Sequence, residues 1–174
     1  PAVKRIYGHG GLCSSGSSCG GACAECAWCS CDDDVGFIVS LTRGLLATDA
    51  LGMDSTRAYV AGCSNGGMMA YELAMRAPAG LYAAFVTNCG LPHVGHLCAP
   101  ARLRPILHLH ATNDHTIPPD GTPAHDGGWR FEKALELLAR LRQAAGCEPG
   151  AGISEDDSPW IWLRSLASPS SSSP

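Results

Sequence analysis

The sequence has no excess of positive charge and no long apolar run. Its 174 residues carry 12 Lys and Arg against 16 Asp and Glu, which gives a formal net charge of −4 and an isoelectric point near 5.9. A nucleic-acid-binding surface would need a basic stripe, and none is present. No apolar segment approaches the roughly 20 residues that a transmembrane helix requires. The chain also starts at Pro1 without an initiating methionine or a signal peptide, so we interpret it as a fragment or a processed piece.

Cysteine, by contrast, is abundant. Six of the ten cysteines lie between Cys13 and Cys31. Such density predicts disulfides in an oxidising compartment. The same Cys23-x2-Cys26-x2-Cys29 spacing would suggest zinc in a cytosolic protein. Because no paired Cys-x-x-Cys follows downstream, we rank disulfides first, a metal site second and a plain cysteine-rich loop third, and we assign no metal and no cofactor.

The most informative motif is a Gly-x-Ser-x-Gly turn formed by Gly62, Ser64 and Gly66. A β-prone run at 58–61 precedes it, and an apolar-periodic segment of helix formers follows it. A strand, a tight turn and a helix around this motif are typical of the nucleophile elbow of an α/β-hydrolase. The flanking glycines fit a turn where strand and helix backbones nearly touch. The backbone N–H of Asn65 would lie at the helix start and could stabilise an oxyanion.

The alternative interpretation of Ser64 is an ordinary capping serine in a glycine-rich turn. The surrounding pattern favours the elbow, because the helix closes near Pro78 and Gly80 and a second apolar strand starts at Tyr82. A strand, a helix and a second buried strand predict a parallel βαβ unit. The motif therefore indicates acyl transfer with Ser64 as the nucleophile.

The chain divides into three parts. Residues 1–31 are a Cys/Gly/Ser-rich irregular segment, with one short strand expected near its start. Residues 32–146 carry the periodic patterns of an α/β core with a parallel sheet flanked by helices. Residues 147–174 lose this pattern and end in a Ser/Pro tail that we expect to be disordered.

Two further helices are expected in the core. The first follows the aspartates at 32–34 and ends near Gly52, and its apolar face comprises Val35, Ile38, Val39, Leu41, Leu45 and Leu46. The second spans 129–145, and its expected buried side comprises Phe131, Ala134, Leu135, Leu137, Leu138 and Leu141.

Asp114 follows the third expected strand, which spans 105–110. Functional groups in parallel α/β sheets lie just past the carboxyl ends of the strands. Asp114 therefore stands where the acid of a Ser–Asp–His triad is needed, to orient a histidine and stabilise its imidazolium form. An Asx-turn aspartate in a polar loop is the alternative. The presence of Ser64 favours the acid.

Three blocks of this sequence together resemble one family. They are Asp-Asp-Val-Gly-Phe-Ile at 33–38, Ala-Gly-Cys-Ser-Asn-Gly-Gly-Met-Met-Ala-Tyr at 61–71 and Leu-His-Leu-His-Ala-Thr-Asn-Asp at 107–114. Their order and spacing resemble those of the polyhydroxybutyrate depolymerase and feruloyl esterase-like group of α/β-hydrolases. The resemblance covers about residues 17–118.

The resemblance implies a secreted carboxylic-ester hydrolase acting on hydroxyalkanoate or feruloyl-type esters. We expect no cofactor, and the composition predicts no nucleic-acid or membrane partner. It carries Ser64 over as the nucleophile and Asp114 as the acid. Cys98 also resembles a family cysteine, which favours disulfides and an extracellular location.

The chain departs from the family at both ends. The family places its catalytic histidine in a late Gly-rich stretch before Trp-Pro, and nothing here matches. After Asp114 the remaining histidines are His115, which adjoins the acid, and His125, which we name as the candidate base. The oxyanion strand of the family ends in His-Gly well upstream of the Asp-Asp block, whereas Gly8-His9-Gly10 lies too close to it.

The other histidines have more ordinary interpretations. His93 and His96 precede Cys98 on one loop, but this single cluster is a poor indicator of a metal site. His108 and His110 alternate on one face of the third expected strand, where hydrogen bonds at a strand end commonly satisfy such side chains.

Three hypotheses follow. The first is a serine esterase of the depolymerase group, present as a partial α/β-hydrolase chain. The second is a catalytically incomplete fragment that keeps the elbow and lacks the base. The third is a cysteine-rich binding module at residues 13–31.

Overall fold

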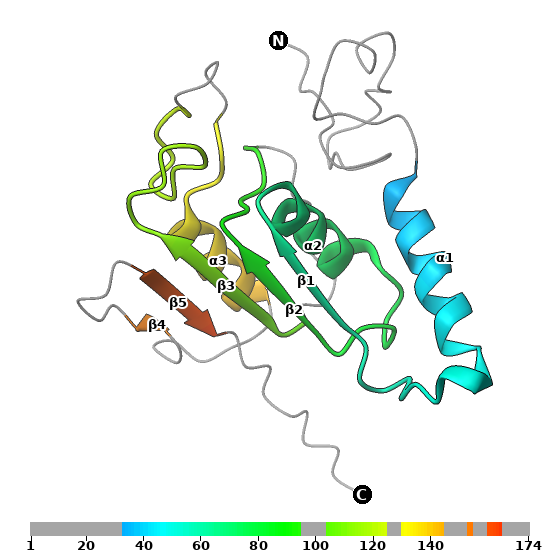
Figure 1. Cartoon of the computed structure of the whole chain (residues 1–174). Helices are drawn as coiled ribbons and strands as arrows, with labels where there is room; N and C mark the ends of the chain where they lie inside the picture. Colours follow the sequence, from blue (N-terminus) through cyan, green and yellow to red (C-terminus); the bar gives the residue numbers. More distant parts are fainter. Residues whose placement is uncertain (1–32, 95–103, 125–129, 145–152, 155–159, 165–174) are drawn as a thin grey trace, which may run out of the picture.

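The computed structural model describes residues 33–94, 104–124 and 130–144, together with two strands at 153–154 and 160–164. These residues form an α/β fold with one five-stranded sheet in the order β1-β2-β3-β5-β4 (Figure 1). Strands β1 (Tyr59–Cys63), β2 (Ala84–Asn88) and β3 (Ile106–Ala111) are parallel. The sequence predicted these three strands and the helix between the first two, and the α/β class with three parallel strands is confirmed.

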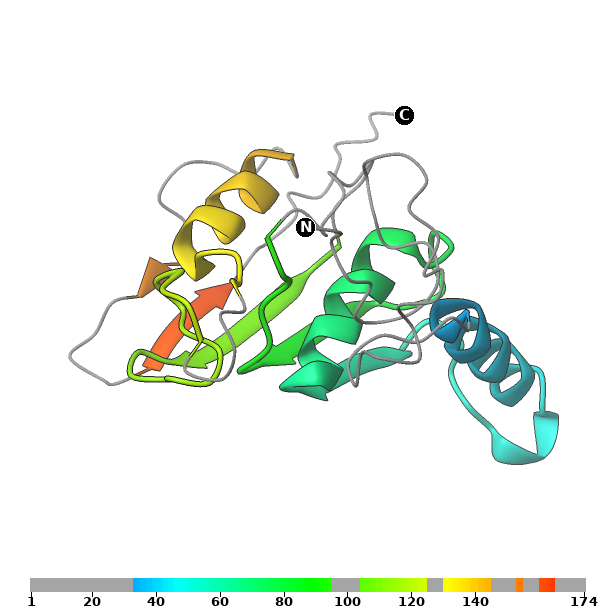
Figure 2. The same cartoon turned by 90° about the horizontal axis from the view of Figure 1, so that it is seen from above.

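The parallel strands bury one face and leave the other more open. Val60, Phe85 and Thr87 alternate with more exposed neighbours, and β3 buries Ile106, His108 and His110 in the same alternating manner. Figure 2 shows helices α2 (Asn65–Arg76) and α3 (Ala134–Ala144) on one side of the sheet. The buried core lies between these two helices and the strands.

Strand β5 (Trp160–Arg164) pairs antiparallel with β3, and the short β4 (Ile153–Ser154) pairs antiparallel with β5. Both strands lie in the segment 147–174, for which the sequence analysis expected no packed element, so this expectation needs correction. The run Trp-Ile-Trp-Leu in β5 combines aromatic and β-branched residues, which have high strand propensity, and that signal outweighs the polar composition around it.

The first helix, α1 (Asp34–Leu46), begins where the sequence predicted and ends earlier. The Asp33 carboxylate caps it by accepting a hydrogen bond from Gly36 N–H at 2.9 Å. The backbone of Thr48 is extended, and a separate 3-10 turn, η2 (Asp49–Leu51), leads to Gly52 in the left-handed conformation. The expected helix to Gly52 is therefore two elements.

Helix α3 begins at Ala134, later than the expected start at 129. The preceding backbone pairs with another loop, because Glu132 N–H donates to Pro92 O and Val94 N–H donates to Arg130 O. Phe131 and four helix residues are buried as expected, whereas Leu135 is 40% exposed. Leu135 points about 100° away from Ala134 around the helix axis, which takes it off the buried stripe.

Candidate functional site

Ser64 occupies a sharp turn between β1 and α2. Its backbone has φ 55° and ψ −120°, a conformation that L-residues rarely adopt. Two hydrogen bonds hold it: Ser64 N–H donates to Asn88 O at 2.8 Å, and Met68 N–H donates to Ser64 O at 3.1 Å. A strained non-glycine residue of this kind costs about 1–3 kcal/mol and persists only where its surroundings enforce it.

Close backbone contacts enforce this turn. A Cβ atom on Gly62 would overlap the carbonyl group of Gly66, so only glycine fits at position 62. A Cβ on Gly90 would overlap Ser64 O, and one on Gly67 would lie 3.0 Å from the Cα of Gly90. These contacts confirm the crowding that was predicted at Gly62.

The crowding predicted at Gly66 is not found, because a Cβ there would meet nothing within 4 Å. Gly66 contributes its carbonyl to the contact with Gly62, while its own Cα hydrogens face open space. The positions that the sequence analysis missed are Gly67 and Gly90. Gly90 comes just after β2, and only the tertiary contact between that loop and α2 identifies it.

Asn65 is the first residue of α2, directly after Ser64. The first N–H groups of a helix have no partner within the helix, and the helix dipole makes this end attractive to negative charge. Ser64 and Asn65 are both exposed residues in the structure, so the start of α2 beside Ser64 is open to solvent. This placement is the one that an oxyanion donor requires.

Asp114 lies in the loop after β3, at the same carboxyl edge of the sheet as Ser64 (Figure 1). Its Oδ1 accepts hydrogen bonds from Thr116 N–H at 2.8 Å and from Ile117 N–H at 3.0 Å. Its Oδ2 lies 3.3 Å from His110 Nε2. Asp114 therefore does form an Asx turn, but the turn uses only Oδ1, and Oδ2 faces His110.

Cys89 lies between Ser64 and Asp114 along this edge of the sheet. It follows β2, the strand between β1 and β3, and has a second positive φ of 50°. Among the residues that the structure describes, Ser64 and Cys89 are the non-glycine residues with positive φ. Burial raises the pKa of the Cys89 thiol, and the charge of Asp114 raises it further, so Cys89 stays a neutral thiol.

Asn88 lies between two free thiols. Its Nδ2 donates to Cys63 Sγ at 3.7 Å, and Cys89 Sγ donates to its Oδ1 at 3.4 Å. Both cysteines are free in the structure. The cysteines of the N-terminal segment and Cys98 lie outside the described residues, as does Cys147.

His108 and His110 are completely buried under this edge of the sheet, and their rings stack at a centroid distance of 5.2 Å. His108 Nδ1 lies 2.7 Å from Thr87 Oγ1 and 3.0 Å from Tyr71 OH. Burial, with a smaller contribution from His110, lowers the pKa of His108 to about 3. Both rings are therefore neutral, and in the described part of the chain hydrogen bonds satisfy one nitrogen of each ring and not the other.

No histidine in the described part of the chain hydrogen-bonds to Ser64. His93 is buried, with its ring 4.4 Å from the Phe131 ring, and His115 is exposed directly after Asp114. His125, the candidate base, and His96 lie outside the described residues. The loop that leads to His125 is described up to Ala124 and belongs to the same carboxyl edge as Asp114 (Figure 1).

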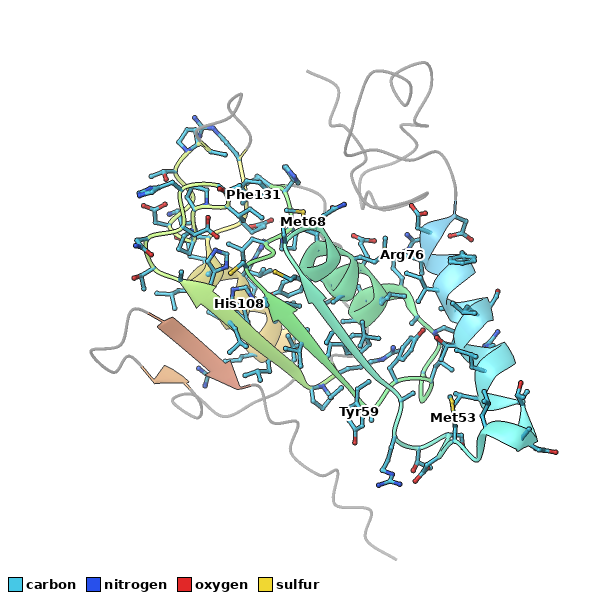
Figure 3. The ribbon with its side chains drawn as sticks, viewed as in Figure 1. Met53, Tyr59, Met68, Arg76, His108 and Phe131 are labelled. Atoms are coloured by element: carbon cyan, nitrogen blue, oxygen red, sulfur yellow. The ribbon has the colours of Figure 1, made fainter. Side chains whose placement is uncertain are left out.

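A hollow of about 440 Å³ lies elsewhere, among Leu46, Met53, Asp54, Arg57, Ala58 and Tyr59. Tyr59 starts β1, whereas Ser64 follows its last residue, so the hollow belongs to the opposite end of this strand. Figure 3 shows Met53 and Tyr59 at that end, away from Met68 and His108. We therefore do not assign the hollow to the Ser64 site.

No group of three or more His, Cys, Asp or Glu side chains in the described ranges is placed to bind a metal ion. No described helix combines the length and the apolar character that crossing a membrane requires.

Comparison with known proteins gave no match to a family model, a curated protein or a solved structure.

Proposed function

We propose that this chain is a serine-dependent carboxylic-ester hydrolase with a partial α/β-hydrolase fold. The observation that carries the proposal is the Ser64 turn, where a nucleophilic side chain is exposed at a strained strand-to-helix junction beside a helix N-terminus. Gly62 and Gly90 enforce a strained geometry that a capping serine would not need. Strain of this kind concentrates at functional sites.

The chemistry would proceed through an acyl-enzyme. Ser64 Oγ attacks the ester carbonyl while a histidine accepts its proton, and the Asn65 N–H helps to hold the oxyanion. The alcohol leaves with the proton that the histidine returns. Water then attacks the acyl-enzyme with the histidine as base, which releases the carboxylic acid and restores Ser64. Asp114 is the acid that orients this histidine, and His125 is the candidate for it.

The substrate class rests on the resemblance of the three sequence blocks to the depolymerase and feruloyl esterase-like group. We therefore propose esters of hydroxyalkanoates or of feruloyl-type acids as substrates. An extracellular location with disulfides in the N-terminal segment belongs to the same proposal, because the resemblance is to a secreted group and the chain has ten cysteines.

Labelling of the full chain with a fluorophosphonate probe tests this function. We expect the probe to label Ser64, and Ser64→Ala to lose at least about 10³-fold in labelling rate because the nucleophile is gone. Ser40→Ala is the matched control, since Ser40 is an exposed serine on α1. His125→Ala should reduce labelling strongly if His125 is the base.

A folded chain whose Ser64 does not react would overturn the proposal. That outcome would favour the catalytically incomplete fragment, in which the turn remains and no base activates it. Hydrolysis of short hydroxybutyrate oligomers and of methyl ferulate by the labelling-competent protein would then separate the two substrate classes.

A further inference from the structure

We propose that His110 is a positioning residue that holds Asp114 as the acid of the site, an inference that rests on the proposed function. His110 occupies β3 and is completely buried, four residues before Asp114. Its Nε2 lies 2.8 Å from Ile117 O and 3.3 Å from Asp114 Oδ2. One buried nitrogen thus faces both the carboxylate and the far end of the loop that carries it.

The surroundings of His110 fix its protonation. Nε2 faces two acceptors, a carbonyl and a carboxylate, so it must carry the hydrogen and donate. Burial lowers the pKa of His110, which keeps the ring neutral, although Ile117 O and Asp114 partly oppose this shift. A neutral ring that donates through Nε2 orients the carboxylate without cancelling its charge. An acid that must stabilise an imidazolium needs that charge intact.

The two oxygens of Asp114 have different tasks in this arrangement. Oδ1 is occupied by the N–H groups of Thr116 and Ile117, which curl the loop around it. Oδ2 is the oxygen that remains for a base, and His110 lies beside it. Without the His110 donor, both the hydrogen bond to Ile117 O and the contact with Asp114 Oδ2 would be lost.

His110 also links the Asp114 loop to helix α2, which begins next to Ser64. Its ring stacks on that of His108, whose Nδ1 contacts Tyr71 OH on α2 at 3.0 Å. The N-terminal end of α2 is Asn65, next to Ser64. Buried side chains therefore connect the loop of the acid to the helix of the nucleophile. A displacement of about 1 Å in such a constellation can reduce the rate about 10²-fold.

The test compares His110→Gln with His110→Asn in the full chain. The glutamine amide can donate near the place of Nε2, whereas asparagine is too short to reach Ile117 O. We expect His110→Asn to label with fluorophosphonate at least about tenfold more slowly than the wild type, and His110→Gln to recover most of that rate. His93→Leu is the control for a buried histidine whose ring packs on Phe131, and it should change the melting temperature without changing the labelling rate.

Two measurements distinguish positioning of Asp114 by His110 from a merely structural role of His110. In the Asp114→Asn background, His110→Asn should reduce labelling less than about threefold further, because its effect acts through Asp114. The pH midpoint of labelling should also move to lower pH in His110→Asn, since a displaced carboxylate no longer raises the pKa of the base. Additive losses and an unmoved midpoint would overturn the inference.

If the His110 variants fail to fold, a measurement on the wild-type protein still tests the contact. In ¹⁵N-histidine-labelled wild type, the Nε2–H of His110 should exchange slowly, and its resonance should shift in Asp114→Asn. An unshifted resonance would overturn the contact itself. If wild-type Ser64 is not labelled at all, the proposed function fails and the positioning role fails with it. If the wild type is labelled and the coupling is absent, only the role of His110 fails.

Discussion

Helices α1 and α2 have similar lengths and both carry apolar residues at helical spacing, yet they are buried very differently. Helix α2 buries seven of its twelve residues, including Met68, Tyr71 and Leu73. Helix α1 buries Val35 and Val39 and leaves an apolar stripe on the outside, with Phe37 67% exposed, Leu41 50% and Leu45 42%.

The difference comes from how each helix meets the sheet. Helix α2 continues directly from β1, and the glycines at its start bring it into backbone contact with the neighbouring loop. Helix α1 lies beyond β1, beside α2 (Figure 2), and a hydrogen bond of 2.8 Å between Thr42 Oγ1 and Tyr82 OH helps to fix it. Apolar residues at helical spacing therefore indicate which side chains share one face of a helix. Whether that face is buried depends on how closely the rest of the fold packs against the helix.

The largest effect should come from the glycine contact that anchors α2. Gly62→Ala would force a Cβ atom into the carbonyl group of Gly66, and backbone cannot rotate away as a side chain can. We expect a loss of at least about 3 kcal/mol in the free energy of unfolding, or failure to fold. Urea unfolding followed by circular dichroism measures this loss.

Gly66→Ala is the matched control, because it adds the same methyl group two residues beyond Ser64 in open space. Alanine is a better helix former than glycine, so this variant should keep or raise the stability by up to about 1 kcal/mol. Equal losses in the two variants would show that the close contact does not anchor the turn.

A second pair of substitutions compares the two helices directly. Leu73 on α2 is 1% exposed and Leu41 on α1 is 50% exposed. Leu73→Ala should lower the free energy of unfolding by about 2–5 kcal/mol, because it leaves a cavity in the core. Leu41→Ala should change it by about 0.5 kcal/mol or less, as surface substitutions do. A large loss for Leu41→Ala would mean that α1 is covered in solution.

The sequence was sufficient for the features that depend on neighbouring residues. The parallel strands, the turn at Ser64 and the position of Asp114 follow from apolar runs, from glycine spacing and from the rule that sites lie at carboxyl ends of strands. The cap of α1 by Asp33 also depends only on local chemistry.

Features that depend on distant contacts could not be predicted in this way. The need for glycine at Gly90 arises from a loop that crosses the start of α2. The late start of α3 results from backbone pairing between Glu132 and Pro92. The role we propose for His110 needs Ile117 and Asp114 to curl back over the strand, which no spacing in the sequence indicates.

The smallest expected effect concerns Glu72, an ionisable side chain that α2 buries. Glu72 is 2% exposed, and its carboxylate lies 3.5 Å from Arg76 Nη1. Burial raises the pKa of Glu72 to about 7, although Arg76 partly opposes the shift. The folded state therefore holds a proton that the unfolded chain, with a pKa near 4.5, has already released.

Stability should consequently fall as the pH rises from about 4.5 to about 7, by up to about 1.4 kcal/mol for each pH unit, and level off above that range. Glu72→Gln keeps the shape and removes the titration, so it should flatten this part of the profile and stabilise the protein by about 1–3 kcal/mol at pH 8. Urea midpoints measured from pH 5 to pH 8 test this expectation. Glu136→Gln on α3 is the matched control, because it makes the same substitution at an exposed glutamate. A profile that Glu72→Gln leaves unchanged would show that Glu72 is solvated in solution, and that α2 covers the sheet less completely than its apolar residues indicate.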